Sequence, residues 1–258
     1  MAPTDQDGFA FRFDWGVEGL RALAPSSAVV VIVDVLRFTT TVTVAVGRGA
    51  EVLPHPWKHD ELDAYAAARG AVAAHGRESA VTPERPWSLS PKRMSAIPAG
   101  TRVVLPSPNG SALAFAAHDA GASVVLAGCL RNASAVASAA FEIAGHRGAI
   151  AVIAAGERWP GRDTLRPAVE DLVGAAAILA ALDPAGSVSA PSCSPEAMAA
   201  RAAFSPARPR LREVLATCSS GRELAESGLH DDVDMAAAWN TDTAVPVLRG
   251  DAFVSLRE

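Results

Sequence analysis

Asp34 and Arg37 lie where an apolar run of the sequence ends and a threonine-rich segment begins. The segment reads DVLRFTTT and closes with Thr39, Thr40 and Thr41. If a helix begins here, its free N–H groups and positive dipole end suit a phosphate group, and the arginine can add two parallel hydrogen bonds to that group. A carboxylate would repel the phosphate unless it holds a metal ion or attacks phosphorus. Because the same residue types also cap helices, a cap beside a surface arginine is the competing interpretation.

Two further segments carry an asparagine among small residues. Asn109, Gly110 and Ser111 follow an apolar run in LPSPNGSALAF, and a tight turn there would point backbone N–H groups at an anion. Asn132 lies in GCLRNASAV, where it can also cap a helix. Turns and caps of this kind are common, so neither segment indicates a binding site by itself.

A fourth segment is rich in charge. It reads AAGERWPGRDTLRPAVEDLVGAAAIL and carries Glu157 and three arginines before the adjacent acids Glu170 and Asp171. The helix dipole favours acids early in a helix, which is the structural interpretation. Carboxylate oxygens are also the ligands that Mg²⁺ prefers, which is the functional interpretation. The sequence leaves both open.

Other common catalytic and metal-binding signatures are missing from the sequence. It contains no GxSxG, GxxxxGK[ST] or GxGxxG motif. DVLRFT also differs from the DxDx[TV] pattern of another phosphatase class, because Leu36 occupies the third position. The three cysteines form no CxxC pair. His55 and His59 have helical spacing, but the prolines at 54 and 56 argue against a helix that would present both to a metal.

Alternating strands and helices are required to bring these segments together. Apolar, β-branched runs predict strands at 28–33, 51–53, 101–105, 123–127 and 149–154, with late strands at 245–248 and 252–256. Intervening segments predict helices at 39–49, 60–74, 109–118, 132–144 and 169–182. This recurrence predicts an α/β fold with a mainly parallel sheet, helices on both faces and a largely helical C-terminal part from 195 to about 239. Ligands in such folds bind beyond the carboxyl ends of the strands, where all four segments fall.

Length, composition and charge limit the classes of function. The 258 residues, half of them hydrophobic, fit a single α/β unit over 1–258 or two lobes with the second beginning near 120. The net charge of −5 gives no reason to expect a nucleic-acid partner. The apolar runs are too short to span a membrane, and the first residues lack a secretion signal, so we expect a cytoplasmic protein. The segment 82–98 is expected to be a loop, and Asp231, Asp232 and Asp234 a solvated face.

Taken together, the four segments resemble the 2-phosphosulfolactate phosphatase family. Members of that family carry DVLRATT after a strand, a TTNGT-like turn, G-S-x-x-N-A-x-A-V, and an AG segment followed by ED and a helix of small residues. This chain has, in the same order, DVLRFTT, SPNGS, GCLRNASAV, and AG followed by ED and GAAAIL. A late acidic stretch and VPVL also match, so the resemblance covers roughly 28–248. The chain departs from the family at SLSP, where members often carry an asparagine before Ser-Pro, and at SPNG in place of TTNG.

The resemblance implies Mg²⁺-dependent removal of phosphate from 2-phospho-3-sulfolactate. Asp34 would either bind Mg²⁺, which orients an attacking water, or attack phosphorus itself. The remaining expected roles are catalysis by Arg37 and Glu170, metal binding by Glu157 and Asp171, and substrate binding by Thr39, Thr40, Asn109, Gly110, Ser111 and Asn132. Two alternatives stay open: a phosphatase for another phosphorylated hydroxy acid, and a non-catalytic anion-binding homologue. The expected partner is a small anionic phosphate ester, and assembly as a homodimer is left open.

Overall fold

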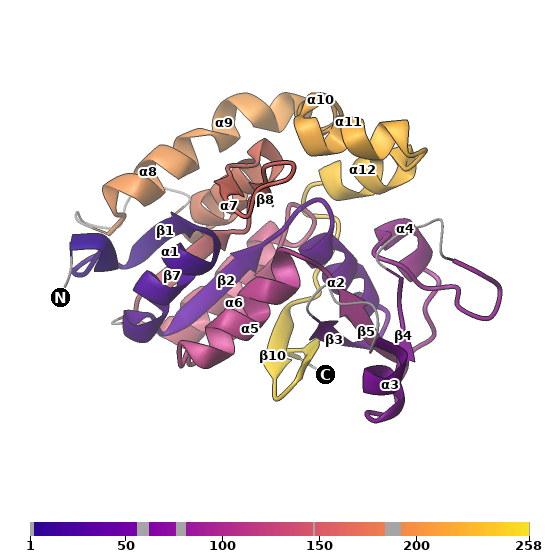
Figure 1. Ribbon diagram of the computed structural model, residues 1–258. Coiled ribbons are helices and arrows are strands. Elements are labelled where there is room, and N and C mark those ends of the chain that lie inside the picture. The colour runs from indigo at the N-terminus through magenta and orange to yellow at the C-terminus, as the bar shows by residue number, and fades with distance from the viewer. Residues whose placement is uncertain (1–2, 56–61, 76–80, 147, 184–191, 258) are drawn as a thin grey trace.

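The computed structural model describes residues 3–55, 62–75, 81–146, 148–183 and 192–257. Within these residues one sheet contains nine strands: β1 Phe11–Trp15, β2 Val29–Val33, β3 Glu51–His55, β4 Val72–Ala73, β5 Arg102–Pro106, β6 Val125–Gly128, β7 Ile150–Ala154, β10 Pro246–Arg249 and β11 Ala252–Ser255. Their order in the sheet is β1-β7-β2-β6-β10-β11-β3-β5-β4 (Figure 1). β1, β7, β2 and β6 pair in parallel, as do β3, β5 and β4. The hairpin β10–β11 is antiparallel to its neighbours and joins these two parallel blocks.

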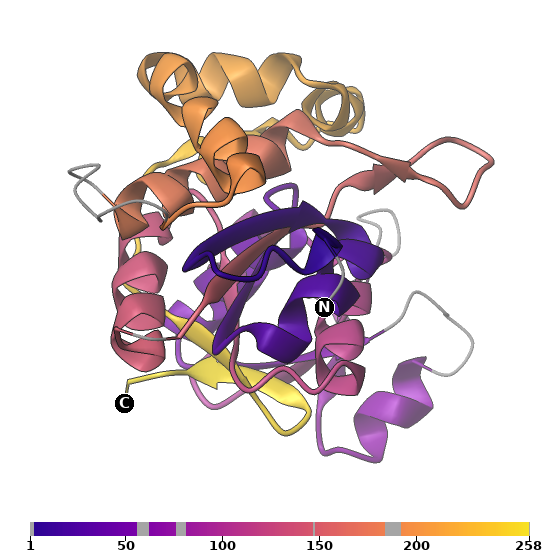
Figure 2. The same cartoon turned by 90° about the vertical axis from the view of Figure 1, so that its left-hand side faces the viewer.

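Helices cover both faces of the sheet, as Figures 1 and 2 show. Among the described residues they are α1 Gly16–Leu23, α2 Phe38–Gly47, α3 Leu62–Ala67, α4 Pro91–Met94, α5 Gly110–Asp119, α6 Ala133–Ala144, α7 Val169–Leu182, α8 Pro195–Ala202, α9 Phe204–Ala207, α10 Leu211–Thr217, α11 Ser219–Glu226 and α12 His230–Ala237. One hydrophobic core lies under α6, α7 and the C-terminal helices, and a second lies under α1, α2 and α5. The expected α/β class, with a mainly parallel sheet and helices on both faces, is confirmed.

The central strand β2 shows how the sequence builds these two cores. Successive side chains of a strand point to opposite faces of the sheet. Val30 and Ile32 therefore enter the core under α1, α2 and α5. Val29, Val31 and Val33 enter the core under α6 and α7. Because both faces are covered, the strand is apolar at every position instead of alternating with polar residues.

Helix α2 forms although most of its residues are β-branched. Such residues lose side-chain freedom in a helix and favour strands. Here every residue from Phe38 to Val46 is buried, so packing outweighs the weak intrinsic preference. The Thr43 hydroxyl also donates to the backbone oxygen of Thr39 over 2.7 Å, so this polar group is satisfied inside the core.

The C-terminal helices form an arc over one side of the molecule (Figure 1). α8 packs against β1 at one end, and α12 packs against α4 at the other. The chain then returns to the sheet as β10 and β11. This confirms the expected helical C-terminal part and its two late strands. Among the described helices, none combines the length and apolar composition that crossing a membrane requires.

One predicted helix is shorter than expected. The pattern predicted a helix over 60–74, whereas the structure has α3 at Leu62–Ala67 and then the short strand β4. Gly70, at φ +60, adopts a left-handed conformation that ends a helix. Val72 and Ala73 then pair with β5 at the end of the sheet. Residues 56–61, which include His59, lie outside the described residues.

The structure also contains elements that the sequence analysis did not predict. β1 and α1 precede the first predicted strand. The strand reads FRFDW, in which aromatic residues alternate with Arg12 and Asp14. This alternation is the signal that could have identified it. The predicted loop at 82–98 contains the short helix α4, whose first turn is capped by the Ser90 hydroxyl.

Candidate active site

The loops that follow β2, β5 and β7 meet at the candidate site. Three antiparallel pairings separate β2 from β5 in the sheet, so a flat sheet would carry the ends of these two strands to opposite edges. The ends nevertheless meet, as a hydrogen bond shows: the backbone N–H of Gly110 after β5 donates to the Asp34 carboxylate after β2. The twist that accumulates from strand to strand allows this approach.

Asp34 is buried and is held from two sides by the backbone. Its Oδ1 accepts from the N–H of Phe38 at the start of α2, over 3.1 Å. Its Oδ2 accepts from the N–H of Gly110 at the start of α5, over 2.8 Å. A side chain at position 110 would overlap the Phe38 ring, so only glycine allows α5 this close to α2. The carboxylate therefore has a fixed orientation between two helix starts.

Asp171 performs a similar task between β2 and β7. Its Oδ1 accepts from the N–H of Val35 over 2.7 Å, and its Oδ2 accepts from the N–H of Gly156 over 2.9 Å. Both oxygens of this buried carboxylate thus hold the backbone just beyond the two strands. Asp171 therefore contacts the loop that carries Asp34 through the N–H of the adjacent Val35.

Glu157 and Glu170 complete a group of four neighbouring acids. Glu157 lies in β8 Glu157–Arg158, which pairs with β9 Leu165–Arg166, and its Oε2 accepts from Asn109 Nδ2 over 2.9 Å. Glu170 precedes Asp171 on α7 and is 2% exposed. Burial first, and then the Glu170 carboxylate, raises the pKa of the Cys218 thiol to about 12, which places Glu170 beside the start of α11.

Burial and neighbouring charge raise the pKa of three of these acids, Asp34, Glu157 and Asp171. Burial is the largest cause and raises the pKa of Asp34 to about 6, with a further increase from Glu170. Burial, followed by the charge of Asp34, raises the pKa of Glu157 to about 7 and places the pKa of Asp171 well above its usual value. Several carboxylates crowded together out of water carry a repulsion that a cation would relieve.

Arg37 reaches the same site and forms a buried ion pair. Its Nη1 lies 2.7 Å from Asp232 Oδ2, and the two side chains are 9% and 1% exposed. Asp232 Oδ1 also accepts from the Ser90 hydroxyl over 2.5 Å and from the N–H of Lys92 over 3.3 Å. The guanidinium is therefore held by an aspartate of α12, which Ser90 and the start of α4 hold in turn.

The buried position of Asp232 corrects the sequence analysis. Asp231 and Asp234 are exposed, as expected for a solvated face, but the same expectation for Asp232 is wrong. α12 turns the side of Val233 and Ala236 toward the core, and Asp232 lies beside them within reach of Arg37. An acid within the buried stripe of a helix was the available signal.

A pocket of about 280 Å³, here called the Asp34 pocket, opens above these groups. Its polar lining includes side chains from four separate parts of the chain: Asp34, Arg37, Ser107, Asn109, Glu157 and Ser220. A second pocket, of about 490 Å³, adjoins it and shares Pro108, Asn109 and Glu157. Four of the expected site residues, Asp34, Arg37, Asn109 and Glu157, thus line one pocket.

Three expected substrate-binding hydroxyl groups instead hold the backbone. Thr39 Oγ1 donates to the Asp34 backbone oxygen over 2.9 Å, and Thr40 Oγ1 donates to the Val35 oxygen over 2.8 Å. Ser111 Oγ donates to the Leu105 oxygen over 3.1 Å. The Thr39 N–H also donates to the Asp34 oxygen. These contacts shape the loops around the pocket, and direct substrate contacts by the three residues stay predictions.

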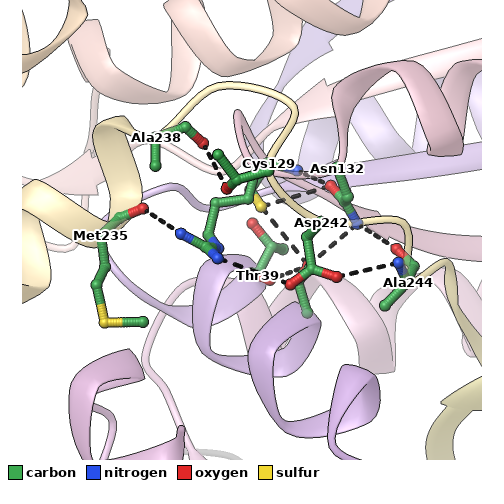
Figure 3. A network of polar contacts seen from close by, with 10 residues as sticks. Thr39, Cys129, Asn132, Met235, Ala238, Asp242 and Ala244 are labelled. Atoms are coloured by element: carbon green, nitrogen blue, oxygen red, sulfur yellow. Dashed lines mark hydrogen bonds and ion pairs between the residues drawn. The ribbon is translucent and has the colours of Figure 1, made fainter.

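Asn132 lies in a separate polar network, drawn in Figure 3. Its Oδ1 accepts from the Cys129 N–H over 2.9 Å, and its Nδ2 donates to Thr43 Oγ1 and to the Ala244 oxygen. Asn132 therefore ties the loop after β6 to α2 and to the segment that leads into β10. It is not among the residues that line the Asp34 pocket, and its expected contact with substrate stays a prediction.

Comparisons with known proteins show the family to which the chain belongs. The profile of the 2-phosphosulpholactate phosphatase family matches residues 18–251, which include every expected site residue. A protein of Thermus thermophilus, named as a probable 2-phosphosulfolactate phosphatase, is 33% identical over 224 residues, which cover 86% of this chain and 88% of that protein. The chain therefore belongs to the 2-phosphosulpholactate phosphatase family and is a phosphoric monoester hydrolase.

Proposed function

We propose that the protein hydrolyses 2-phospho-3-sulfolactate to 3-sulfolactate and phosphate, with Mg²⁺ as its cofactor. The observation that carries the proposal is the convergence of Asp34, Arg37, Asn109 and Glu157 on one small pocket beyond the strand ends. The family supports the substrate. A pocket of about 280 Å³ suits a compact ester better than a large phosphorylated molecule.

Arg37 is the residue we assign to the phosphoryl group. The guanidinium lines the pocket, and its ion pair with Asp232 fixes it without requiring a substrate. A planar guanidinium presents several N–H donors, so one nitrogen can stay on Asp232 while others bind phosphoryl oxygens. Such a prearranged donor stabilises charge without having to reorganise during the reaction. Asn109, whose side chain already contacts Glu157, lies at the same pocket wall.

The donor set fits Mg²⁺ if few protein ligands are needed. In the described residues no three His, Cys, Asp or Glu side chains are arranged as a ready metal-binding group. Mg²⁺, however, is commonly bound by one or two carboxylates together with water and substrate phosphate. Asp34 and Glu157 line the same pocket and are the carboxylates we assign to it. When bound, Mg²⁺ supplies positive charge that offsets the negative charge of the phosphoryl oxygens.

The contacts of the other acids favour supporting roles. Both Asp171 oxygens accept from backbone N–H groups, so we assign Asp171 to positioning the Asp34 loop. Glu170 is buried beside it and is not among the pocket-lining residues, so its catalytic role stays a prediction. Asp34 also accepts two backbone hydrogen bonds, which stabilise its charged form and weaken it as a nucleophile. We therefore favour metal binding over attack on phosphorus for Asp34.

A phosphate-release assay tests the proposal. The protein would be incubated with 2-phospho-3-sulfolactate, with 2-phospholactate and with phenyl phosphate, each with Mg²⁺ and with a chelator. We expect the highest kcat/KM for 2-phospho-3-sulfolactate and loss of activity in chelator. A higher kcat/KM for 2-phospholactate would assign the site to another hydroxy acid. Full activity without metal would contradict the Mg²⁺ assignment, and binding of the esters without phosphate release would identify a non-catalytic homologue.

A further inference from the structure

The hydroxyl group of Ser220 has no hydrogen-bond partner among the described residues, although it is buried. The residue is 5% exposed. Leaving a buried hydroxyl unpaired costs free energy, so native proteins rarely do so without a reason. Ser220 also belongs to the residues that line the Asp34 pocket. A polar group that the described protein leaves unsatisfied in the wall of a pocket is suited to a ligand.

Ser220 comes from a different wall of the pocket than the groups assigned to phosphate. Asp34 and Arg37 belong to the loop after β2, whereas Ser220 lies in the first turn of α11. α11 also contributes Glu223 and Leu224 to the lining, and Ser227 directly after the helix lines it too. An ester whose phosphoryl group is bound by Arg37 can therefore extend toward α11 within the same pocket.

The start of α11 offers hydrogen-bond donors at this wall. The first turn of a helix carries a partial positive charge and N–H groups without partners inside the helix. One of these, the Gly221 N–H, donates to the Cys218 sulfur over 3.4 Å. Two acids have the opposite effect: Glu223, whose charge water screens because it is exposed, and the buried Glu170 beside Cys218. The contact at this wall that can recognise an acid group is therefore a direct hydrogen bond, not the helix charge alone. The Ser220 hydroxyl, which can donate a hydrogen bond, is the buried polar side chain that α11 contributes to the pocket.

We propose that Ser220 determines specificity by donating a hydrogen bond to the acid group that distinguishes the substrate from a simple phosphate monoester. This inference rests on the proposed function and identifies the wall of the pocket that recognises the substrate. The acid group is a sulfonate or a carboxylate, both of which accept from a hydroxyl. Ser220 is a substrate-binding residue and takes no part in phosphoryl transfer.

Replacement of Ser220 by alanine tests this role, because it should weaken substrate binding without weakening the fold. The lost hydroxyl bonds to nothing in the described part of the protein, so the melting temperature of Ser220→Ala should be equal to or slightly above that of the wild type. If the hydroxyl had a structural role, its removal would lower the melting temperature. Ser219→Ala is the matched control, because it removes a hydroxyl from the neighbouring, exposed position of the same turn.

Kinetics on three esters give the main result. For 2-phospho-3-sulfolactate we expect Ser220→Ala to raise KM about tenfold or more, the usual effect of losing a hydrogen bond to a charged group, with little change in kcat. For phenyl phosphate, which lacks an acid group, both variants should match the wild type. A normal KM for 2-phospholactate would assign the contact to the sulfonate, and a raised one to the carboxylate. An unchanged KM for both acidic esters, or an equal rise for phenyl phosphate, would overturn the proposal.

Binding of 3-sulfolactate provides a measurement that does not depend on turnover. By calorimetry, the wild type and Ser219→Ala should bind this compound with equal affinity, and Ser220→Ala about tenfold more weakly. If no ester were hydrolysed, the proposed function would fail while this comparison still decided the role of Ser220. Equal binding by all three proteins, or no binding by the wild type, would overturn the inference.

Discussion

The Asp34 carboxylate takes its orientation from the backbone of two helices that are far apart in the sequence. The N–H of Phe38 and the N–H of Gly110 each donate to one of its oxygens. A side chain fixed in this way does not need to be ordered when substrate or metal arrives, which is how enzymes reduce the entropic cost of reaching the transition state.

Replacement of Asp34 by asparagine should abolish turnover and leave the fold intact. Asp34→Asn keeps the size of the side chain but removes its charge, so we expect kcat to fall by about 10³-fold or more, or about 4 kcal/mol of barrier. Stability should change little. The variant loses one backbone hydrogen bond, but it also removes the cost of burying a charged carboxylate, a cost that the raised pKa of Asp34 reflects. Phosphate release and thermal unfolding measure the two effects. Near-normal turnover in a folded variant would exclude both proposed roles of Asp34.

Substitutions of Arg37 should separate its charge from its shape. Arg37→Lys keeps the charge but not the planar fork, so it should retain partial activity. Arg37→Ala should lose much more and should also leave Asp232 buried without its partner, which destabilises the protein by about 3–5 kcal/mol.

A second substitution controls for this loss of stability. In Arg37→Ala/Asp232→Asn the uncompensated buried charge is gone, so much of the stability should return while activity stays low. Phosphate release on phenyl phosphate and on 2-phospho-3-sulfolactate, together with chemical denaturation, measures both properties. If the double variant regained activity on either ester, Arg37 would not be the phosphoryl-binding residue.

At the scale of elements, the start of α7 connects the loops after β2 and β7. The Asp171 carboxylate accepts from the N–H of Val35 in one loop and from the N–H of Gly156 in the other. Gly156 has φ +66, a conformation that glycine adopts without strain. One side chain thus sets the distance between the loop that carries Asp34 and the loop that carries Glu157.

Replacement of Asp171 by asparagine should impair this connection. An asparagine offers one acceptor oxygen where the carboxylate offers two, so one backbone N–H would lose its partner, at a cost of about 1–3 kcal/mol. We expect reduced kcat on all esters, including phenyl phosphate, because the position of Asp34 would change. Denaturation and phosphate release test this, with Asp163→Asn in the exposed β8–β9 turn as the control. Full activity and stability of Asp171→Asn would show that the connection is dispensable.

At the scale of the whole molecule, the C-terminal helices close the site that the sheet begins. α12 supplies Asp232, which pairs with Arg37 at a separation of 195 residues in the sequence. α11 supplies one wall of the Asp34 pocket. The Ser90 hydroxyl bonds to the same Asp232, so the segment before α4 is tied to this arrangement. The pocket therefore forms only when the chain is folded over almost its full length.

The buried acids around Asp34 should make the stability of the metal-free protein depend on pH. Asp34 has a pKa of about 6 and Glu157 of about 7, both raised above the values of 3.8 and 4.5 that are usual for these side chains. The folded state therefore binds more protons than the unfolded state between about pH 4 and pH 7, so stability falls as pH rises through this window and levels off above it. Thermal unfolding in chelator should give a lower melting temperature at pH 8 than at pH 5.

Two controls identify the acids as the cause. Glu157→Gln should reduce the difference in melting temperature between pH 5 and pH 8. Mg²⁺ should raise the melting temperature more at pH 8 than at pH 5, because protons compete with a cation for the same carboxylates. If the metal-free protein were equally stable at pH 5 and pH 8, the pKa values of Asp34 and Glu157 would not be raised in the folded state.

Short-range patterns in the sequence determined most of the elements and the positions of several candidate site residues. The apolar run of β2, followed by Asp34 and Arg37, places two polar groups at a strand end from local information alone. The same holds for Asn109 after β5 and Glu157 after β7. Periodicity acts over a few residues, and where it decides an element it can be read directly from the sequence. The helix predicted at 60–74 was too long because pairing of β4 with β5 outweighed the helical pattern.

Tertiary structure alone decided how these groups are used. The sequence offers three neighbouring acids at 231, 232 and 234, and packing of α12 buries Asp232 against Arg37 and leaves the other two in water. The sequence allowed Asp171 to be either a helix-start acid or a metal ligand. In the fold its two oxygens accept from the backbone N–H groups of Val35, 136 residues away, and Gly156. Likewise, only the folded structure shows that the Ser220 hydroxyl is buried without a hydrogen-bond partner among the described residues. The physical reason is that the state of a polar side chain depends on which surfaces exclude water from it, and those surfaces come from distant parts of the chain.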